Sequence, residues 1–179
     1  MDELDKPDDA RREGRSLHEA RAAAGGDRGR LGQTPFGAVV VDLDGQLVGY
    51  GHNTVRAGRD PTAHVEIAAI RAAWRRLGAW QMLSGSTIYS SCEPCLLCSY
   101  VIAQIGFRRA VFAARGADVP GYKPLLGADL GKGSAWINAQ PDWAPLEIVA
   151  DFMRHRALEA IAAFPWAQAQ TRAPLNPSR

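Results

Sequence analysis

The order of apolar segments along the chain predicts an α/β fold. Short apolar runs, typical of buried strands, alternate with longer segments in which apolar residues recur every three or four positions, as in helices. This alternation favours right-handed crossovers and parallel strand pairing, with helices covering both faces of one sheet. The length of 179 residues suits one domain with a full core.

The predicted strands begin with a hairpin. Residues 36–43 form a mostly apolar run, Asp44-Gly45 is a typical hairpin turn, and residues 47–51 supply the partner strand. Three further strands are predicted at 87–89, 110–114 and 146–149.

Three helices are predicted between and after these strands. Asp60 can cap the first helix and Pro61 suits its first position; apolar residues then recur at helical intervals until Gly78 ends it. The second helix, over 95–105, is apolar nearly all round, as expected of a buried helix. A third helix is predicted over 152–164.

The chain divides into a central domain, residues 31–170, and two flanking segments. Residues 1–30 are charged and rich in Ala, Gly and Arg, and we expect them to be helical or partly disordered. Residues 171–179 are predicted to be a disordered tail. Residues 115–144 show no steady period, and since so long a connection in a compact domain is usually functional, we interpret them as the rim or lid of a site.

Composition limits the classes of partner and compartment. With 21 basic and 19 acidic residues, a formal net charge of +2, there is no electrostatic case for nucleic acid. The three cysteines argue for a reducing compartment and against a disulfide scaffold. No run approaches the roughly 20 apolar residues of a membrane span, and the acidic first residues lack the apolar region of a secretory signal. We therefore expect a cytoplasmic protein with no membrane partner.

Two short motifs carry the candidate chemistry: His-Val-Glu at 64–66 and Pro-Cys-Leu-Leu-Cys at 94–98. The imidazole of His64 and the thiolates of Cys95 and Cys98 are three ligands of the right softness for Zn²⁺. Three protein ligands leave one tetrahedral position open, which distinguishes a catalytic zinc from a structural one. We therefore predict that these three residues hold Zn²⁺.

Glu66, two residues past His64, is the predicted catalytic residue. Zinc lowers the pKa of bound water to about 7, and a carboxylate beside it can act in turn as general base and general acid. Each motif is expected to lie in the first turn of a helix. The partial positive charge of the two helix ends then favours thiolates and an ionised Glu66.

Either motif alone is ambiguous. A lone His-x-Glu usually marks an exposed helix face, and a lone Cys-x-x-Cys can be a redox pair or half of a structural zinc site. Their joint occurrence, each opening a helix after a strand, favours the catalytic metal. Cys92 leaves one alternative, the fourth ligand of a closed site, but its position before Pro94 at a strand end favours a small buried residue.

At these residues the chain resembles the cytidine deaminase-like superfamily, and within it the branch of guanine deaminases and tRNA adenosine deaminases. The matching motifs lie between residues 34 and 114: Pro35-Phe36-Gly37-Ala38-Val39, Gly51-His52-Asn53, Asp60-Pro61-Thr62-Ala63-His64-Val65-Glu66 and Ser91-Cys92-Glu93-Pro94-Cys95. The resemblance implies a three-layer α/β/α sandwich with a five-stranded mixed sheet. It also implies a zinc deaminase domain over residues 31–170, a small heterocyclic substrate and a homodimer.

The resemblance also implies which residues contact the substrate. Asn53 is expected to hydrogen-bond it, with a plain turn residue as the alternative. The backbone beside Glu93 is expected to line the pocket. Val65, which replaces the usual Ala, is expected to narrow it, and Phe36 fits the purine-base branch. Trp166 resembles the aromatic segment that closes the pocket in small-base deaminases, where it can stack on a flat base; burial in the core is the alternative.

Departures from the family pattern bear on the substrate. Guanine deaminases carry an Asp after a Gly-aromatic pair, where this chain has Lys123; Asp118, Asp129 and Asp142 are alternative acceptors, with no choice possible between them. The loop and the basic C-terminal helix typical of the tRNA enzymes are absent after Arg115.

We therefore predict a zinc-dependent hydrolytic deaminase of an aminated nucleobase, nucleoside or related heterocycle, with a guanine-type purine favoured. The alternatives are a tRNA wobble adenosine deaminase, a cytosine-type pyrimidine deaminase, and a non-catalytic zinc-stabilised binding module. A base in RNA must be flipped out onto a basic platform, which this charge balance does not provide.

Overall fold

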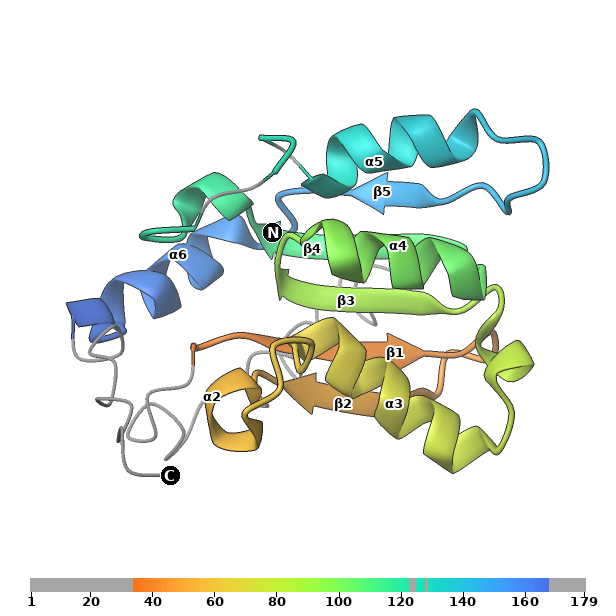
Figure 1. Ribbon diagram of the computed structural model, residues 1–179, viewed down its shortest axis with the longest axis horizontal. Helices are drawn as coiled ribbons and strands as arrows, with labels where there is room; N and C mark the ends of the chain where they lie inside the picture. Colours follow the sequence, from red (N-terminus) through yellow and green to blue (C-terminus); the bar gives the residue numbers. More distant parts are fainter. Residues whose placement is uncertain (1–33, 123–124, 128, 168–179) are drawn as a thin grey trace, which may run out of the picture.

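The computed structural model describes residues 34–122, 125–127 and 129–167, and in these residues five strands form one mixed sheet of order β2-β1-β3-β4-β5 (Figure 1). The strands are β1 (Gly37–Val41), β2 (Leu47–His52), β3 (Thr87–Cys92), β4 (Arg109–Ala114) and β5 (Glu147–Val149). β1 runs antiparallel to β2 and β3, whereas β3, β4 and β5 are parallel. The predicted hairpin and the five-stranded mixed sheet are confirmed.

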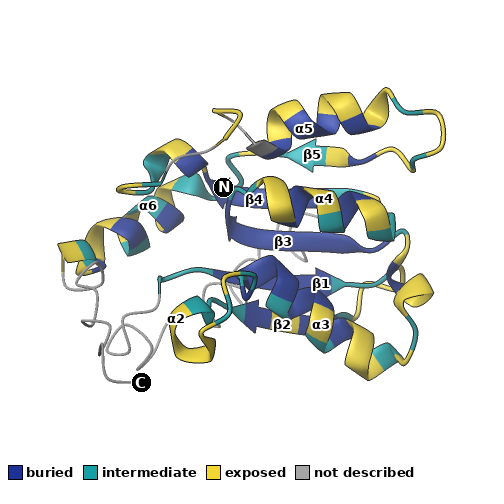
Figure 2. Ribbon diagram, viewed as in Figure 1, coloured by how far each residue is buried: buried dark blue, intermediate teal, exposed yellow. Residues whose placement is uncertain are grey.

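Helices cover both faces of this sheet. The α-helices are α2 (Val55–Gly58), α3 (Val65–Leu77), α4 (Leu96–Ile105), α5 (Asp129–Asn138) and α6 (Arg154–Ala163), and the 3-10 helices are η3 (Trp80–Leu83) and η4 (Gly116–Asp118). One buried apolar cluster joins the sheet to α3, α4 and α5, and a second joins its other face to α6 (Figure 1). Strand β3 is buried throughout and β1 and β4 are buried except at one end residue each, while the outer helix faces are exposed (Figure 2). The three-layer α/β/α prediction is confirmed.

The crossover from β2 through α3 to β3 passes over β1. Because β1 is antiparallel to both neighbours, β2 and β3 point the same way without being adjacent. The predicted parallel pairing therefore holds for β3 with β4, but β2 and β3 are separated by one strand. The carboxyl ends of both strands therefore lie on the same side of the sheet, and α3 and α4 begin there.

The predicted start of α3 at Pro61 is wrong. Asp60 does not cap a helix; its Oδ1 accepts from the Thr62 amide at 2.8 Å and the Thr62 hydroxyl at 2.7 Å, forming a local turn. The helix begins four residues later at Val65, with His64 as an extended N-cap residue. Its predicted end is confirmed, because Gly78 is the left-handed C-cap with φ of 79°.

Helix α5 lies where the sequence pattern predicts none. Leu130, Gly133, Ser134 and Ile137 are buried at helical spacing, but only two of the four are large and apolar. Two glycines within ten residues lower the helix propensity further. The expectations for residues 1–30 and 171–179 lie outside the described residues. None of the described helices has the length and apolar character needed to cross a membrane.

Two glycines of β2 let α3 approach the sheet closely. A β-carbon at Gly51 would lie 2.3 Å from the Ala69 nitrogen and 2.4 Å from the Val65 oxygen. One at Gly49 would lie 2.4 Å from the Ala69 oxygen. These are contacts with helix backbone, which cannot move aside as a side chain can. The two glycines therefore fix the position of α3 and of the residues at its N-terminus.

We expect Gly51→Ala to lower the free energy of unfolding by about 3 kcal/mol or more, at or above the upper end of ordinary overpacking, because helix backbone must shift. Gly131→Ala in α5 is the control, since no atom from outside its own helical turn and chain neighbours lies within 4 Å of its β-carbon position. It should change stability by about 1 kcal/mol or less, in the stabilising direction. Urea unfolding measures both; equal stability of Gly51→Ala and the parent would contradict the close packing.

Candidate metal centre and active site

Two helix N-termini bring the predicted metal ligands together. His64 is the N-cap residue of α3, Cys95 is the N-cap residue of α4, and Cys98 lies in the first turn of α4. The His64 Nδ1 atom lies 3.3 Å from the Cys95 sulfur and 3.6 Å from the Cys98 sulfur. The two sulfurs are 3.7 Å apart. Residues separated by more than thirty positions thus form one compact group.

These distances fit three corners of a zinc tetrahedron. With Zn–S near 2.3 Å and Zn–N near 2.0–2.1 Å, tetrahedral angles require about 3.8 Å between sulfurs and about 3.6 Å between sulfur and nitrogen. The observed separations of 3.7, 3.6 and 3.3 Å agree to within about 0.3 Å. The donor set and its spacing therefore fit Zn²⁺, as the sequence predicts.

Hydrogen bonding among the three donors shifts their pKa values. Hydrogen bonding from Cys98, aided by His64, lowers the pKa of Cys95 to about 4 despite partial burial. The same sharing with Cys95, together with burial, raises the pKa of Cys98. The hydrogen bond to Cys95 raises the pKa of His64. Hydrogen bonds thus join the three donors, and a divalent cation would take the place of the shared protons.

Cys92 does not join this group. Its side chain packs at the end of β3 in the apolar cluster on the α6 side of the sheet, with Val39 and Tyr89. Burial raises the pKa of its thiol, so the group stays neutral. The position matches the small buried residue favoured by the sequence rather than the fourth ligand of a closed site.

Glu66 is buried beside the metal group, with only 4% of its surface exposed. The Ser90 hydroxyl donates a 2.6 Å hydrogen bond to its Oε1 atom. Burial raises the pKa of the Glu66 carboxyl, in opposition to the helix end, which is expected to favour the ionised form. Desolvation outweighs the helix effect here. A raised pKa suits a group that must both take up and release a proton.

A cleft of about 300 Å³ opens onto this group, and it brings together every residue that the sequence predicts for the site except Cys98. The predicted residues that line it are Phe36, Asn53, His64, Val65, Glu66, Glu93, Cys95 and Trp166. Six further lining residues were not predicted: Thr34, Cys92, Val119, Pro120, Gly121 and Tyr122.

The segment Val119–Tyr122 forms one wall of the cleft as a tight turn. The Tyr122 amide donates to the Val119 oxygen at 3.1 Å, and Gly121 has a φ of 75°. Proline at the second position and glycine at the third are typical of a type II turn. This Pro-Gly pair is the sequence signal that marks the rim within the predicted 115–144 segment.

Asn53 makes the expected turn interaction and also lines the cleft. Its Oδ1 atom accepts a 3.2 Å hydrogen bond from the Val55 amide, which is the turn interaction. The side chain also lines the cleft, with its amide nitrogen left as the donor.

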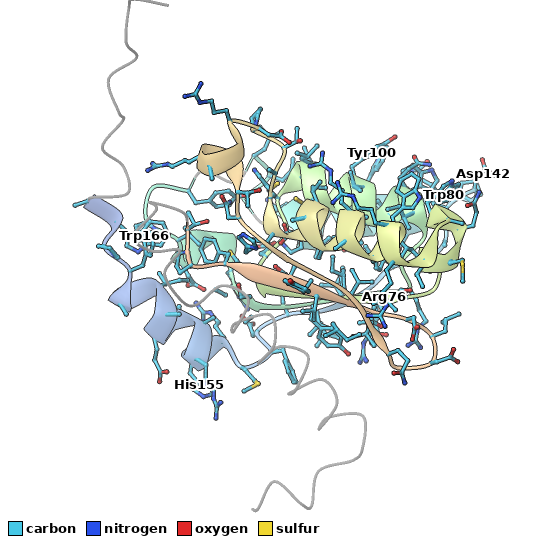
Figure 3. The ribbon with its side chains drawn as sticks, turned by 90° about the horizontal axis from the view of Figure 1, so that it is seen from below. Arg76, Trp80, Tyr100, Asp142, His155 and Trp166 are labelled. Carbon is cyan, nitrogen blue, oxygen red and sulfur yellow. The ribbon has the colours of Figure 1, made fainter. Side chains whose placement is uncertain are left out.

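Two aromatic side chains flank the cleft. The rings of Phe36 and Trp166 have centroids 6.3 Å apart at 44°, and Phe164 packs edge-on against Trp166 at 4.8 Å. The Trp166 indole also donates to the Ile161 oxygen at 2.8 Å, which fixes its orientation beyond the end of α6 (Figure 3).

Two of the alternative acceptors named from the sequence, Asp118 and Asp142, do not line the cleft. Asp118 accepts from the Arg154 guanidinium, with Nε to Oδ2 at 2.9 Å, and from the Arg115 amide at 2.8 Å. Asp142 lies at a second cleft beside Trp143, at the opposite end of the molecule from Trp166 (Figure 3). The side chains of Asp129 and Lys123 are outside the described set.

Comparison with known proteins agrees with this geometry. A family model described as the cytidine and deoxycytidylate deaminase zinc-binding region matches residues 11–114, more than half of the chain. The chain belongs to this zinc-binding deaminase family. The predicted membership of the cytidine deaminase-like superfamily is thereby confirmed.

Individual relatives of the family carry two kinds of name. A tRNA-specific adenosine deaminase of Aquifex aeolicus is 39% identical over 99 residues, which are 55% of this chain and 61% of that protein. A guanine deaminase of Bacillus subtilis is 44% identical over 84 residues, 47% of this chain and 53% of that protein. The chain thus spans about half to three fifths of these relatives' length. The solved guanine deaminase from Nitrosomonas europaea superposes with a TM-score of 0.67 at 26% identity, covering 87% of this chain and 83% of that one.

We expect Cys98→Ser to lose zinc, because a hydroxyl replaces one of two soft thiolate ligands of this family's metal group. Cys92→Ser is the matched control, a buried cysteine of the neighbouring strand end, and should keep about one zinc per chain. Metal analysis of the purified variants measures both. Zinc loss from Cys92→Ser would contradict the assignment of His64, Cys95 and Cys98 as the three ligands.

The Asp118–Arg154 pair predicts a stability difference that depends on pH. Hydrogen bonding from Arg154 holds the pKa of Asp118 below its usual 3.8, so the pair stabilises the fold above that pH and less as pH falls through the folded value. Asp118→Asn should cost about 1 kcal/mol at neutral pH, and the difference should vanish in acid. Urea unfolding at several pH values measures this difference in free energy of unfolding. Arg154→Gln and the double variant complete a double-mutant cycle. A difference that stays constant at all pH values would contradict the prediction.

Proposed function

We propose that this chain is a zinc-dependent hydrolytic deaminase of an aminated nucleobase, nucleoside or related heterocycle, with a guanine-type purine base favoured. One observation carries the proposal: the buried Glu66 carboxyl lies in the same cleft as the imidazole–thiol group. In the reaction, water adds to the ring carbon that bears the exocyclic amine. The C–N bond then breaks, leaving a ring carbonyl and ammonia.

The proton transfers fall to Glu66. Bound by His64, Cys95 and Cys98, zinc would supply Lewis-acid activation of water. The Glu66 carboxylate takes a proton from the attacking water and delivers it to the ring nitrogen. It then takes the proton of the newly added hydroxyl as the carbonyl forms and passes it to the amine, which leaves as ammonia. The raised pKa of Glu66 favours the protonated form that these deliveries need.

The remaining cleft residues would bind and orient the ring. The Asn53 amide nitrogen would donate to a ring acceptor, and the faces of Phe36 and Trp166 would pack on the flat base. Val65 and Glu93 would form the walls beside it, with Glu93 held by the Gly116 amide at 3.0 Å. A volume near 300 Å³ is at the small end for ligand pockets, which favours a free base or nucleoside.

Two features support a small substrate over tRNA. The charge balance is nearly even, and an aromatic side chain from the C-terminal segment flanks the cleft. Relatives of both kinds exist, so the tRNA wobble adenosine remains the second candidate. A homodimer and a cytoplasmic location are part of the proposal, supported by the family resemblance and by three free cysteines among the described residues.

We expect the zinc-loaded protein to release ammonia from guanine or a related base, and Glu66→Gln to lose activity by about 10²- to 10⁴-fold while keeping its zinc. The panel consists of guanine, guanosine, adenine, cytosine, cytidine, triazines and an adenosine stem-loop from tRNA. Ammonia release and metal content are measured for both proteins.

The pattern of release separates the candidates. Release from the stem-loop alone, with binding that weakens steeply with salt, would favour the tRNA enzyme. Equal release by Glu66→Gln would contradict the assigned role. If the zinc-loaded parent releases no ammonia from any member of the panel, a binding module or a deaminase of another heterocycle would be favoured.

A further inference from the structure

A buried serine lies directly behind the proposed proton carrier. Ser90 occupies the middle of β3, paired with Ala38 of β1 on one side and Phe112 of β4 on the other. None of its surface is exposed. A buried hydroxyl costs free energy unless it is hydrogen-bonded, and the Ser90 hydroxyl donates to Glu66 Oε1 at 2.6 Å.

The Glu66 carboxyl is held at one of its two oxygens. The Ser90 hydroxyl of the central strand donates to Oε1, and Glu66 also lines the cleft that contains His64 and Cys95. The side chain therefore lies between the sheet and the metal group. A carboxyl with one oxygen engaged in a buried hydrogen bond has two inequivalent oxygens.

We propose that Ser90 is a positioning residue for the proposed deamination. Its hydroxyl donates to Oε1 of Glu66, so that Oε2 is the oxygen that accepts the proton from water and gives it to the substrate. This holds in both states of the cycle, because the hydroxyl can donate to Oε1 whether Oε2 is bare or protonated. The inference rests on the proposed function, which it deepens by assigning the role of each carboxyl oxygen.

The next residue of the strand provides the contrast. Ser91 is also buried, but its hydroxyl accepts from the Gly37 amide at 3.0 Å instead of bonding the Glu66 carboxyl. Successive side chains of a strand point to opposite faces of the sheet. Ser91→Ala therefore removes a buried serine hydroxyl of the same strand without touching the carboxyl.

The first test compares kcat, KM and zinc content of Ser90→Ala with those of Ser91→Ala. Ser90→Ala should lower kcat by about 10- to 100-fold, as expected for losing a hydrogen bond to a charged group. Its KM should change by less than about twofold, because ring contacts are intact. Ser91→Ala should keep the parent kcat. Ser90→Thr, which restores a hydroxyl, should recover kcat.

A merely structural role gives another pattern. In that case Ser90→Ala and Ser91→Ala would lower the melting temperature and kcat together, or Ser90→Thr would fail to recover kcat while remaining folded. Either result would overturn the proposal, as would a parent-like kcat in Ser90→Ala.

The second test does not need turnover. In infrared difference spectra, subtraction of Glu66→Gln identifies the carboxyl band of Glu66, and Ser90→Ala should move that band to higher frequency as the hydrogen bond is lost. An unmoved band overturns the proposal even in an active enzyme. A moved band in a protein that releases no ammonia from the panel would support the held carboxyl and count against the proposed substrates, so the two failures are distinguishable.

Discussion

His64 and Cys95 each stand at the N-cap of a helix, and their side chains meet 3.3 Å apart although 31 residues separate them. The sheet makes this meeting possible, because β2 and β3 point the same way on either side of β1 and lead to helices at one edge. Gly49 and Gly51 then set the depth of α3 against β2. The cleft, the metal group and the position of Glu66 all follow from this convergence.

Burial gives the site its chemistry. Glu66 loses water on folding, and the raised pKa that results is opposed by the Ser90 hydrogen bond rather than reinforced by it. Burial thus favours the protonated carboxyl, and the Ser90 hydrogen bond favours the ionised one. A cation at the neighbouring thiols would favour the ionised state, so metal and carboxyl act on one another through a low-dielectric cleft.

Much of the site was predictable because its residues carry local signals. The His-Val-Glu and Pro-Cys-x-x-Cys motifs, the hairpin turn and the five strands all follow from short patterns. The start of α3 could not be predicted, because Asp60 can either cap a helix or form a turn with Thr62. In the folded chain it forms the turn. The engagement of Asp118 by Arg154, 36 residues away, is a tertiary contact with no local signature.

X-ray absorption at the zinc edge of the zinc-loaded protein tests the convergence most directly. The account predicts two sulfur neighbours near 2.3 Å and a single imidazole nitrogen near 2.0–2.1 Å, from Cys95, Cys98 and His64. A third sulfur at the same distance would bring Cys92 into the metal group. It would close the site and contradict the catalytic interpretation.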